Sequence, residues 1–258
     1  MRATPATLPP LFADWFARRG WTPHPHQLAL LEAARDGRSA LLIAPTGGGK
    51  TLAGFLPSLV DLAERPRDGL HTLYISPLKA LAVDIHRNLT APIEELGLPI
   101  RCETRTGDTP AHKRQRQRED PPQMLMTTPE SLALLLSYGD AAQMFGGLQA
   151  IIIDELHALA GSKRGDLLAL GLARLRRLAP DCRRIGLSAT VAWPDDLAAW
   201  LGSGGAEVAR LAARGGASPE VRILATRAEL PWAGHMALHA LAEVYEAISR
   251  HRTTLVFV

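Results

Sequence analysis

The sequence predicts an α/β fold in which a parallel sheet is covered by helices on both faces. Three observations support this prediction. Short apolar runs, as at 40–44 and 150–153, lack polar alternation, which is typical of strands buried on both faces of a parallel sheet. These runs alternate with segments of helical apolar spacing, which favours strands joined by helical crossovers. A glycine-rich loop follows the first run, at 46–49.

The elements can be assigned in chain order. A first helix is expected over about 8–19 and a second from Gln27 to Ala34. The first would bury a stripe of Leu8, Leu11, Phe12, Trp15 and Phe16. We expect this stripe to pack in the core, with stacking near an adenine as the alternative. Strands are expected at Ala40–Ala44, Thr72–Ser76, Ile100–Thr104, Met124–Thr127, Ala150–Asp154 and Arg184–Ser188. Helices are expected between them, at about 52–64, 78–96, 109–118, 129–137, 165–178 and 194–201.

The loop after the first strand has the composition of a phosphate-binding loop. It comprises Thr46, Gly47, Gly48 and Gly49, followed by Lys50 and Thr51. Glycines let successive backbone N–H groups turn toward one anion, and a helix N-terminus adds partial positive charge. Lys50 can reach the β- and γ-phosphates, and the Thr51 hydroxyl can hold Mg²⁺. The pattern predicts a nucleoside-triphosphate site, although Ala44 fills the position that is usually the first glycine.

A second candidate segment of this site lies about a hundred residues later. The apolar run 150–153 ends in Asp154 and Glu155, and the carboxyl ends of parallel strands face the ligand crevice. Asp154 would hold Mg²⁺ through water, and Glu155 would deprotonate the attacking water. The alternative is a solvated acidic pair that opens a helix. Together with the loop, the pair favours one magnesium–triphosphate pocket at the tips of neighbouring strands, where Lys50 meets both carboxylates.

At this point the chain resembles the DExH-box branch of superfamily 2 helicases. The segments that resemble its motifs occur in the family's order: the Q motif (20–27), I (44–51), Ia (76–81), Ib (127–131), II (154–157) and III (188–190). The resemblance implies that Gln27 recognises adenine. It implies that motifs Ia and Ib hold a nucleic-acid backbone, with Lys79, Arg105 and Thr128 as candidate contacts. It also implies that His157, Ser188 and Thr190 couple the nucleotide state to motion.

Longer phrases narrow the resemblance to the large helicase-related (Lhr) group. Thr106–Thr109 and the wording around motifs Ia, Ib and II are similar to that group. The wording of motif I is most similar to the bacterial ligase-associated DExH-box helicases. The resemblance covers about 11–258 and implies a RecA-like P-loop NTPase fold that uses ATP and Mg²⁺. It also implies 3′-to-5′ unwinding of DNA or an RNA–DNA hybrid in DNA repair, with repair proteins as partners.

Glycine clusters near 202–205 and 215–219 predict a domain boundary. We assign 1–36 to the N-terminal helices and Q-motif region, 37–205 to a first RecA-like domain, 206–220 to a linker and 221–258 to the start of a second RecA-like domain. That start would comprise a strand at 221–226, a helix at 234–250 and a strand at 255–258. No segment matches motifs V or VI, so we expect the chain to hold the ATP-binding half of the motor and to hydrolyse ATP very slowly.

Composition limits the class of protein. The chain has 258 residues, 47% hydrophobic and 21% charged, as expected of a globular protein. It lacks an apolar stretch of the ~20 residues that span a membrane and a secretory signal, and its two cysteines are far apart, so we expect a cytoplasmic protein. The net charge of +3 permits nucleic-acid binding without requiring it. The basic run 112–118 is either a phosphate-facing patch or a solvated helical face. A non-catalytic nucleotide- and nucleic-acid-binding module is the alternative to an enzyme.

Overall fold

The computed structural model describes residues 7–78, 85, 89–189, 191–202, 207–213, 220–224 and 238–256. The chain divides into two compact units, residues 1–215 and 216–258. The division falls within the predicted linker. The first unit contains the sheet and all predicted motifs.

The first unit is built on a parallel sheet. Its seven described strands lie in the order β3-β4-β2-β5-β6-β1-β7, and each pair for which a register is defined is parallel. The strands are β1 (Ser39–Ile43), β2 (Thr72–Ile75), β3 (Cys102–Arg105), β4 (Met124–Thr127), β5 (Ala150–Ile153), β6 (Arg183–Ser188) and β7 (Val208–Ala212). The predicted helix-flanked parallel sheet is therefore confirmed. The prediction that Lys50 and the two carboxylates lie at the tips of neighbouring strands was wrong. The strand β6 lies between β1, which precedes the Lys50 loop, and β5, which precedes Asp154.

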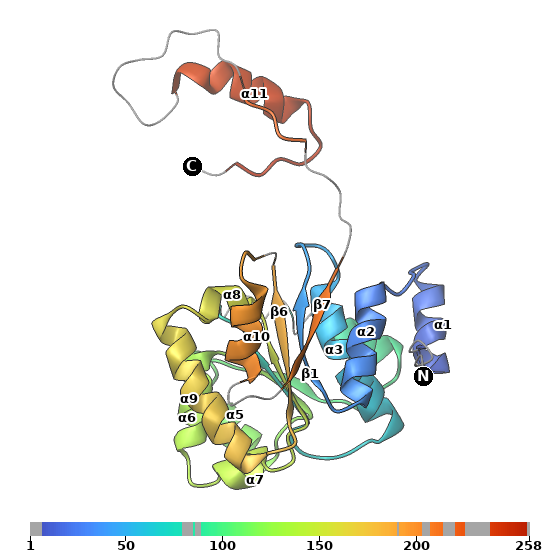
Figure 1. The fold of residues 1–258 in the computed structure, drawn as a ribbon, viewed down its shortest axis with the longest axis vertical. Helices are drawn as coiled ribbons and strands as arrows, with labels where there is room; N and C mark the ends of the chain where they lie inside the picture. Colours follow the sequence, from blue (N-terminus) through green and yellow to red (C-terminus); the bar gives the residue numbers. More distant parts are fainter. Residues whose placement is uncertain are drawn as a thin grey trace. The chain divides into compact units, whose positions relative to one another are not determined.

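Helices cover both faces of this sheet (Figure 1). The side chains of Leu42 and Ile152 pack on one face, in a core cluster shared with α1 (Pro10–Arg18), α2 (Pro25–Arg35) and α3 (Lys50–Glu64). Leu41 and Ile151 pack on the other face, with α6 (Pro129–Ser137), α7 (Ala141–Phe145), α8 (Leu156–Leu159), α9 (Lys163–Leu178) and α10 (Pro194–Gly202). The basic helix α5 (Ala111–Glu119) follows β3. No described helix is long and apolar enough to cross a membrane.

The seventh strand corrects the predicted linker. Val208–Ala212 lies within 206–220 and pairs with β1 along its whole length, from Ser39 opposite Val208 to Ile43 opposite Ala212. Its side chains are only half-buried or exposed, because an edge strand has one neighbour and one free side. A segment of this kind lacks the continuous apolar run by which the inner strands were recognised.

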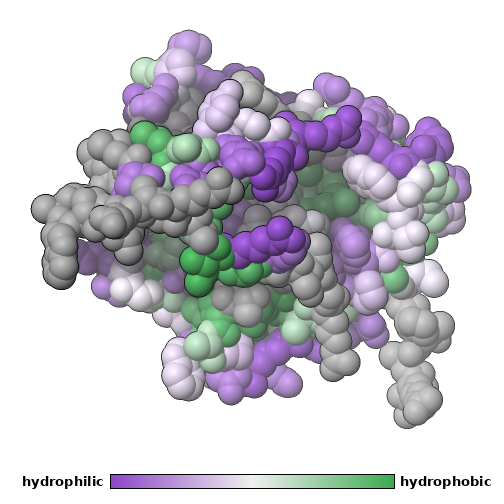
Figure 2. All heavy atoms as spheres, turned by 90° about the horizontal axis from the view of Figure 1, so that it is seen from above, coloured by the Kyte–Doolittle hydropathy of each residue, from purple (hydrophilic) through white to green (hydrophobic). Residues whose placement is uncertain are grey.

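The second unit contains a 3₁₀ turn (Leu238–Ala240) and α11 (Leu241–Ser249) among its described residues. The strands expected at 221–226 and 255–258 were wrong for the described residues 221–224 and 255–256, which have no regular structure. A strand needs a partner for its backbone groups, and the described part of this unit provides none. Large hydrophobic side chains are exposed in this unit, including Val221, Ile223 and Leu255. On the molecular face drawn in Figure 2, patches of hydrophobic residues lie among hydrophilic ones.

A buried polar pair joins α3 to the start of β2. Nε2 of His71 lies 2.7 Å from Oδ2 of Asp61, and Nδ1 lies 2.7 Å from the Thr72 hydroxyl. Burial lowers the pKa of His71, so the neutral imidazole donates to Asp61 and accepts from Thr72. The hydrogen bond from His71 lowers the pKa of Asp61 to about 2, with a further contribution from Arg65.

We expect Asp61→Ala to lower the free energy of unfolding by about 1–3 kcal/mol, because it leaves a buried donor of His71 unpaired. Urea denaturation would measure the loss, with the exposed Asp14→Ala as the control. Since the folded pKa of Asp61 lies below its ordinary 3.8, the parent's advantage should be complete above that pH and should disappear as the pH falls toward 2. An advantage that persists undiminished at low pH would contradict this assignment.

Candidate functional site

The glycine loop between β1 and α3 has the backbone of an anion cradle. Gly47 and Gly49 have φ angles of 79° and 71°, which L-residues with side chains rarely adopt. A Cβ on Gly49 would also lie 3.1 Å from Nε2 of Gln27. Because α3 begins at Lys50, the unpaired N–H groups of its first turn lie at the end of the loop.

Lys50 is folded against its own loop. Only 8% of the residue is exposed, and its ammonium donates a hydrogen bond of 3.0 Å to the carbonyl oxygen of Ala44. A carbonyl is a weaker partner for a cation than a phosphate. The ammonium can therefore exchange this bond for a charge-assisted one when an anion enters the loop.

Asp154 is the carboxylate at the end of β5, and both of its oxygens have protein donors. Oδ1 accepts a hydrogen bond of 2.9 Å from the backbone N–H of Glu155, and Oδ2 accepts one from the Tyr74 hydroxyl. Burial, with the neighbouring Asp154, raises the pKa of Tyr74, so this phenol stays protonated and donates. Each carboxylate oxygen keeps a further lone pair for a metal-bound water.

Glu155 has the only positive φ among the described non-glycine residues, at 46°. A left-handed backbone is costly for such a residue and often marks a functional site. It turns the chain at once from β5 into α8, so that Glu155 and His157 come together: Oε2 lies 3.5 Å from Nδ1. The same Nδ1 lies 3.2 Å from the Ser188 hydroxyl at the end of β6. His157 thus contacts the segments predicted as motifs II and III. Thr190 lies outside the described residues.

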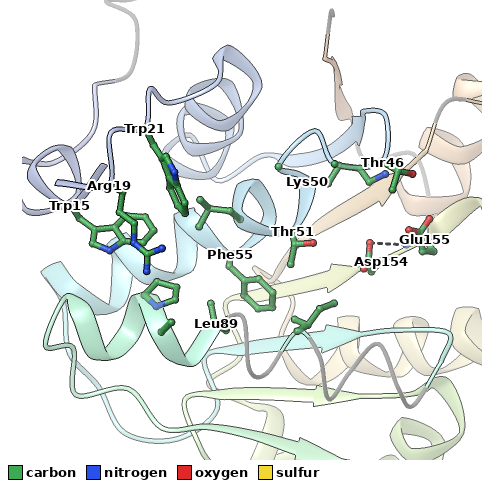
Figure 3. Close-up of a pocket in the computed structure, with 16 residues that line it drawn as sticks. Trp15, Arg19, Trp21, Thr46, Lys50, Thr51, Phe55, Leu89, Asp154 and Glu155 are labelled. Atoms are coloured by element: carbon green, nitrogen blue, oxygen red, sulfur yellow. Dashed lines mark hydrogen bonds between the residues drawn. The ribbon is translucent and has the colours of Figure 1, made fainter. Parts of the chain in front are cut away.

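One cavity of about 600 Å³ brings the predicted groups together (Figure 3). Its wall includes Lys50, Asp154 and Glu155, so the lysine and both carboxylates face a common space as expected. The remaining lining residues run from the loop along α3 to α1: Trp15, Arg19, Trp21, Thr46, Gly47, Gly49, Thr51, Leu52, Phe55, Ile85, Leu89, Ala91 and Pro92.

The end of the cavity away from the carboxylates is aromatic. Arg19 lies over the rings of Trp21 and Trp15, with its guanidinium carbon 4.9 and 5.7 Å from their centroids. Glu95 fixes this arrangement by accepting hydrogen bonds from Arg19 and from Nε1 of Trp15. Trp21 is 46% exposed, which leaves much of its surface free for a ligand.

Gln27 is not among the residues that line this cavity. It is buried, and its Oε1 accepts a hydrogen bond of 2.9 Å from the backbone N–H of His24 at the start of α2. Its amide nitrogen faces Gly49. In this conformation Gln27 therefore supports the loop, and adenine recognition by Gln27 stays a prediction.

The candidate nucleic-acid contacts are differently placed. Lys79 lies outside the described residues. Arg105 and Thr128 are each only 3% exposed. The guanidinium of Arg105 donates to the carbonyl oxygen of Arg114, at 2.6 Å. Thr128 is the N-cap of α6 and accepts from the N–H of Ser131. Both side chains therefore support the fold here, a role that residue type alone did not indicate.

The basic helix α5 is partly neutralised. Glu103 on β3 lies 3.7 Å from Lys113 and 2.6 Å from Arg116. Arg118 lies 3.4 Å from Asp140, and its guanidinium carbon lies 4.1 Å from the ring centroid of Tyr138. These pairings favour the solvated helical face over the phosphate-facing patch, because several charges already have protein partners.

Tyr74, Arg19 and Trp21 were not predicted as site residues from the sequence. A signal existed for Tyr74: a tyrosine within a strand buried on both faces must place its hydroxyl against a polar partner. Trp21 lies in the Q-motif segment, but nothing in its spacing indicates that it lines the same cavity as Lys50. Arg19 directly follows the last residue of α1, and nothing in the local sequence distinguishes it from an ordinary surface arginine.

The family model of the DEAD/DEAH box helicases matches residues 24–197. The matched range includes the glycine loop, Lys50, Asp154 and Glu155, which line the cavity. The chain belongs to the DEAD/DEAH box helicase family. The resemblance read from the motifs is thus confirmed, together with the RecA-like fold of this helicase domain.

The relatives of this DEAD/DEAH box protein include several that carry the Lhr name. The chain is 44% identical to "Lhr helicase/probable uracil glycosylase" of Mycolicibacterium smegmatis over 74% of its length. It is 38% identical to "Lhr helicase/uracil glycosylase" of Escherichia coli over 98% of its length. It covers only 14% and 19% of these relatives. The narrower likeness to ligase-associated helicases stays a prediction.

Solved structures agree with these relatives. The structure of Mycobacterium smegmatis Lhr bound to single-stranded DNA and AMP-PNP matches 95% of the chain with a TM-score of 0.80 and 36% identity, and the match covers 33% of that protein. The helicase MrfA bound to DNA matches 82% of the chain with a TM-score of 0.69 and 29% identity, over 30% of that protein. The likeness therefore extends from the sequence to the fold.

Proposed function

We propose that the chain is the ATP-binding motor half of an Lhr-type ATP-dependent nucleic-acid helicase or translocase. One observation supports this most: a glycine loop with its lysine and two adjacent carboxylates line the same cavity. These are the groups needed to bind a triphosphate and to activate a water molecule against it. A solvated acidic pair at a helix start, the alternative considered for Asp154 and Glu155, has no reason to face Lys50.

The residues fit MgATP. Gly47 and Gly49 adopt backbone angles that suit a phosphate cradle, and Lys50 can replace its carbonyl partner by a phosphate. Thr51 and Asp154 offer the oxygen ligands that Mg²⁺ prefers, directly or through water. Bound Mg²⁺ would neutralise charge on the phosphates. We therefore propose Lys50, Thr51 and Asp154 as the MgATP-holding residues, with Thr46–Gly49 as the backbone cradle.

We propose that the nucleobase lies at the aromatic end of the cavity. Trp21 offers a half-exposed ring, and Arg19 lies over that ring within the same lining. Flat aromatic and guanidinium groups stack well against a purine. Stacking near an adenine was the alternative role considered for the apolar stripe of the first helix. We propose this role for Trp21, which lies outside that stripe. Recognition of adenine by Gln27 would require its amide to turn from His24.

Glu155 is the proposed general base. Its strained backbone directs the carboxylate into the cavity, and its contact with His157 continues to Ser188. We propose that this chain of contacts links the nucleotide state to the segment after β6, with Thr190 as a further member. A carboxylate placed for proton transfer favours the enzyme over a non-catalytic binding module.

The nucleic-acid side of the proposal depends on likeness. The similar structures of Lhr and MrfA are bound to single-stranded DNA and to DNA. We propose that this chain binds a nucleic-acid strand through the segments at the carboxyl ends of β2, β3 and β4, for which Lys79, Arg105 and Thr128 were predicted as contacts. Backbone contacts of this kind give affinity with little sequence preference. Unwinding in the 3′-to-5′ direction, a role in DNA repair and repair partners are further proposals, and the cytoplasmic location stays a prediction.

We expect the chain alone to bind ATP but to hydrolyse it very slowly. Arginine fingers contribute about 10³–10⁵ in rate to such reactions. The only arginine that lines the described cavity is Arg19, which Glu95 holds at the aromatic end. A steady-state ATPase assay with and without single-stranded DNA tests this expectation. Turnover near that of an intact helicase would contradict it, whereas failure to bind ATP at all would refute the proposed function.

A further inference from the structure

Tyr74 is the buried residue of this region whose placement the motifs leave unexplained. It lies on β2 opposite Ile152 of β5, on the same sheet face as Leu42 and Met126. The residue is 1% exposed. Its hydroxyl reaches along the strand direction to Oδ2 of Asp154, two positions beyond its strand partner.

The phenol ring is held from a second element. Phe55 on α3 stacks on Tyr74 with ring centroids 4.9 Å apart and planes 19° from parallel. Phe55 lies on the helix that begins at Lys50 and lines the nucleotide cavity itself. A single aromatic pair therefore joins the phosphate-loop helix to the carboxylate at the end of β5.

We propose that Tyr74 is a positioning residue that fixes the Asp154 carboxylate for Mg²⁺-dependent nucleotide binding. The inference rests on the proposed function, since it assigns Asp154 to the Mg²⁺ site. Hydrogen bonds from Tyr74 and from the Glu155 N–H approach different oxygens, so they determine both the place and the plane of the carboxylate. The lone pairs that remain then point in fixed directions, and no rotational freedom is lost when a hydrated metal ion binds.

This role separates two parts of nucleotide affinity. The part that the loop and Lys50 supply needs no metal ion and does not involve Tyr74. The part that Mg²⁺ supplies depends on Asp154 and hence on Tyr74. Tyr74→Phe removes one oxygen and keeps the ring that stacks on Phe55, so it tests the hydrogen bond and little else.

The experiment measures equilibrium binding of a fluorescent, non-hydrolysable ATP analogue to the full chain, first in EDTA and then across a Mg²⁺ titration. We expect Tyr74→Phe to keep the parent's affinity in EDTA and to need about 10-fold more Mg²⁺ for half-maximal enhancement, the lower end of effects seen when a metal ligand loses its hydrogen-bond partner. Tyr245→Phe, with an exposed ring in the second unit, is the matched control and should equal the parent.

A double-mutant cycle tests whether Tyr74 acts through Asp154. In an Asp154→Ala background, adding Tyr74→Phe should change nothing further, because the carboxylate to be positioned is gone. Thermal unfolding checks that each variant is folded. Should Tyr74→Phe fail to fold, Phe55→Leu keeps the hydroxyl but removes its stacking partner, and it should shift the Mg²⁺ midpoint in the same direction.

The outcomes are distinct. An unchanged Mg²⁺ midpoint in the folded variant overturns the inference, as do equal losses of affinity with and without Mg²⁺ or additive effects in the cycle. If the parent chain itself binds no nucleotide, the proposed function fails first. If the parent binds nucleotide with Mg²⁺ enhancement, and Tyr74→Phe and Asp154→Ala weaken that enhancement while Tyr245→Phe does not, the inference is supported.

Discussion

Lys50→Ala is expected to reduce the chain's affinity for ATP by about 10- to 100-fold. Hydrogen bonds to charged groups are worth about 1.5–3 kcal/mol each, and 1.4 kcal/mol corresponds to a tenfold change in affinity. Lys50 lies at the first turn of α3, where its ammonium and the helix N-terminus would act on the same phosphate. Titration with a fluorescent ATP analogue would measure the loss.

Two controls make this result specific. Lys163→Ala removes an exposed lysine at the start of α9, outside the cavity lining, and should bind ATP as the parent does. Lys50→Met fills the space of the aliphatic stem and should lose affinity as Lys50→Ala does, which excludes a packing defect. Parent-like affinity in both Lys50 variants would refute the assignment of the phosphate loop.

Glu155→Gln is expected to leave ATP affinity within about twofold and to reduce hydrolysis by about 10²–10⁴-fold, the usual contribution of a general base. Glutamine has nearly the same shape as glutamate, so the left-handed backbone at this position is equally strained in both proteins. It cannot accept the proton of the attacking water. Single-turnover hydrolysis with the chain in excess over labelled ATP would detect even slow chemistry.

Glu64→Gln is the matched control, because this exposed carboxylate at the end of α3 lies outside the cavity lining. Its hydrolysis rate should equal that of the parent. If Glu155→Gln hydrolyses ATP as fast as the parent, Glu155 is not the base. If the parent binds ATP but does not hydrolyse it even in a single turnover, the non-catalytic binding module becomes the better description.

The inner strands could be predicted because each is buried on both faces and therefore reads as an apolar run. All six predicted strands coincide with β1 to β6, and their ends differ by at most two residues. The edge strand β3, whose residues are alternately half-buried and buried, was predicted although it is not a continuous apolar run. The edge strand β7 was not predicted, because none of its residues is buried and its sequence therefore lacks an apolar run. The short helices α7 and α8 also escaped, since one turn or so is too short for a helical period to be recognised.

The order of the strands in the sheet could not be predicted from the sequence, for a different reason. Some neighbours in this sheet, such as β1 and β6, are separated by more than a hundred residues. An apolar run shows that a strand is buried but does not indicate which strand pairs with it. The order decides that Ser188, at the tip of β6, lies between the phosphate loop and Asp154. It also places Tyr74 beside β5, where its hydroxyl meets Asp154.

The sequence alone determined the chemistry of this protein: a glycine cradle, a lysine and a carboxylate pair, since backbone freedom and charge are properties of residue type. Only the tertiary structure decided which side chains share a cavity and which are buried and hydrogen-bonded within the fold. It turned Arg105 and Thr128 inward and brought Trp21 and Arg19 to the cavity that Lys50 lines. The physical reason is that burial and hydrogen-bond pairing depend on neighbours distant in the chain, which no local pattern specifies.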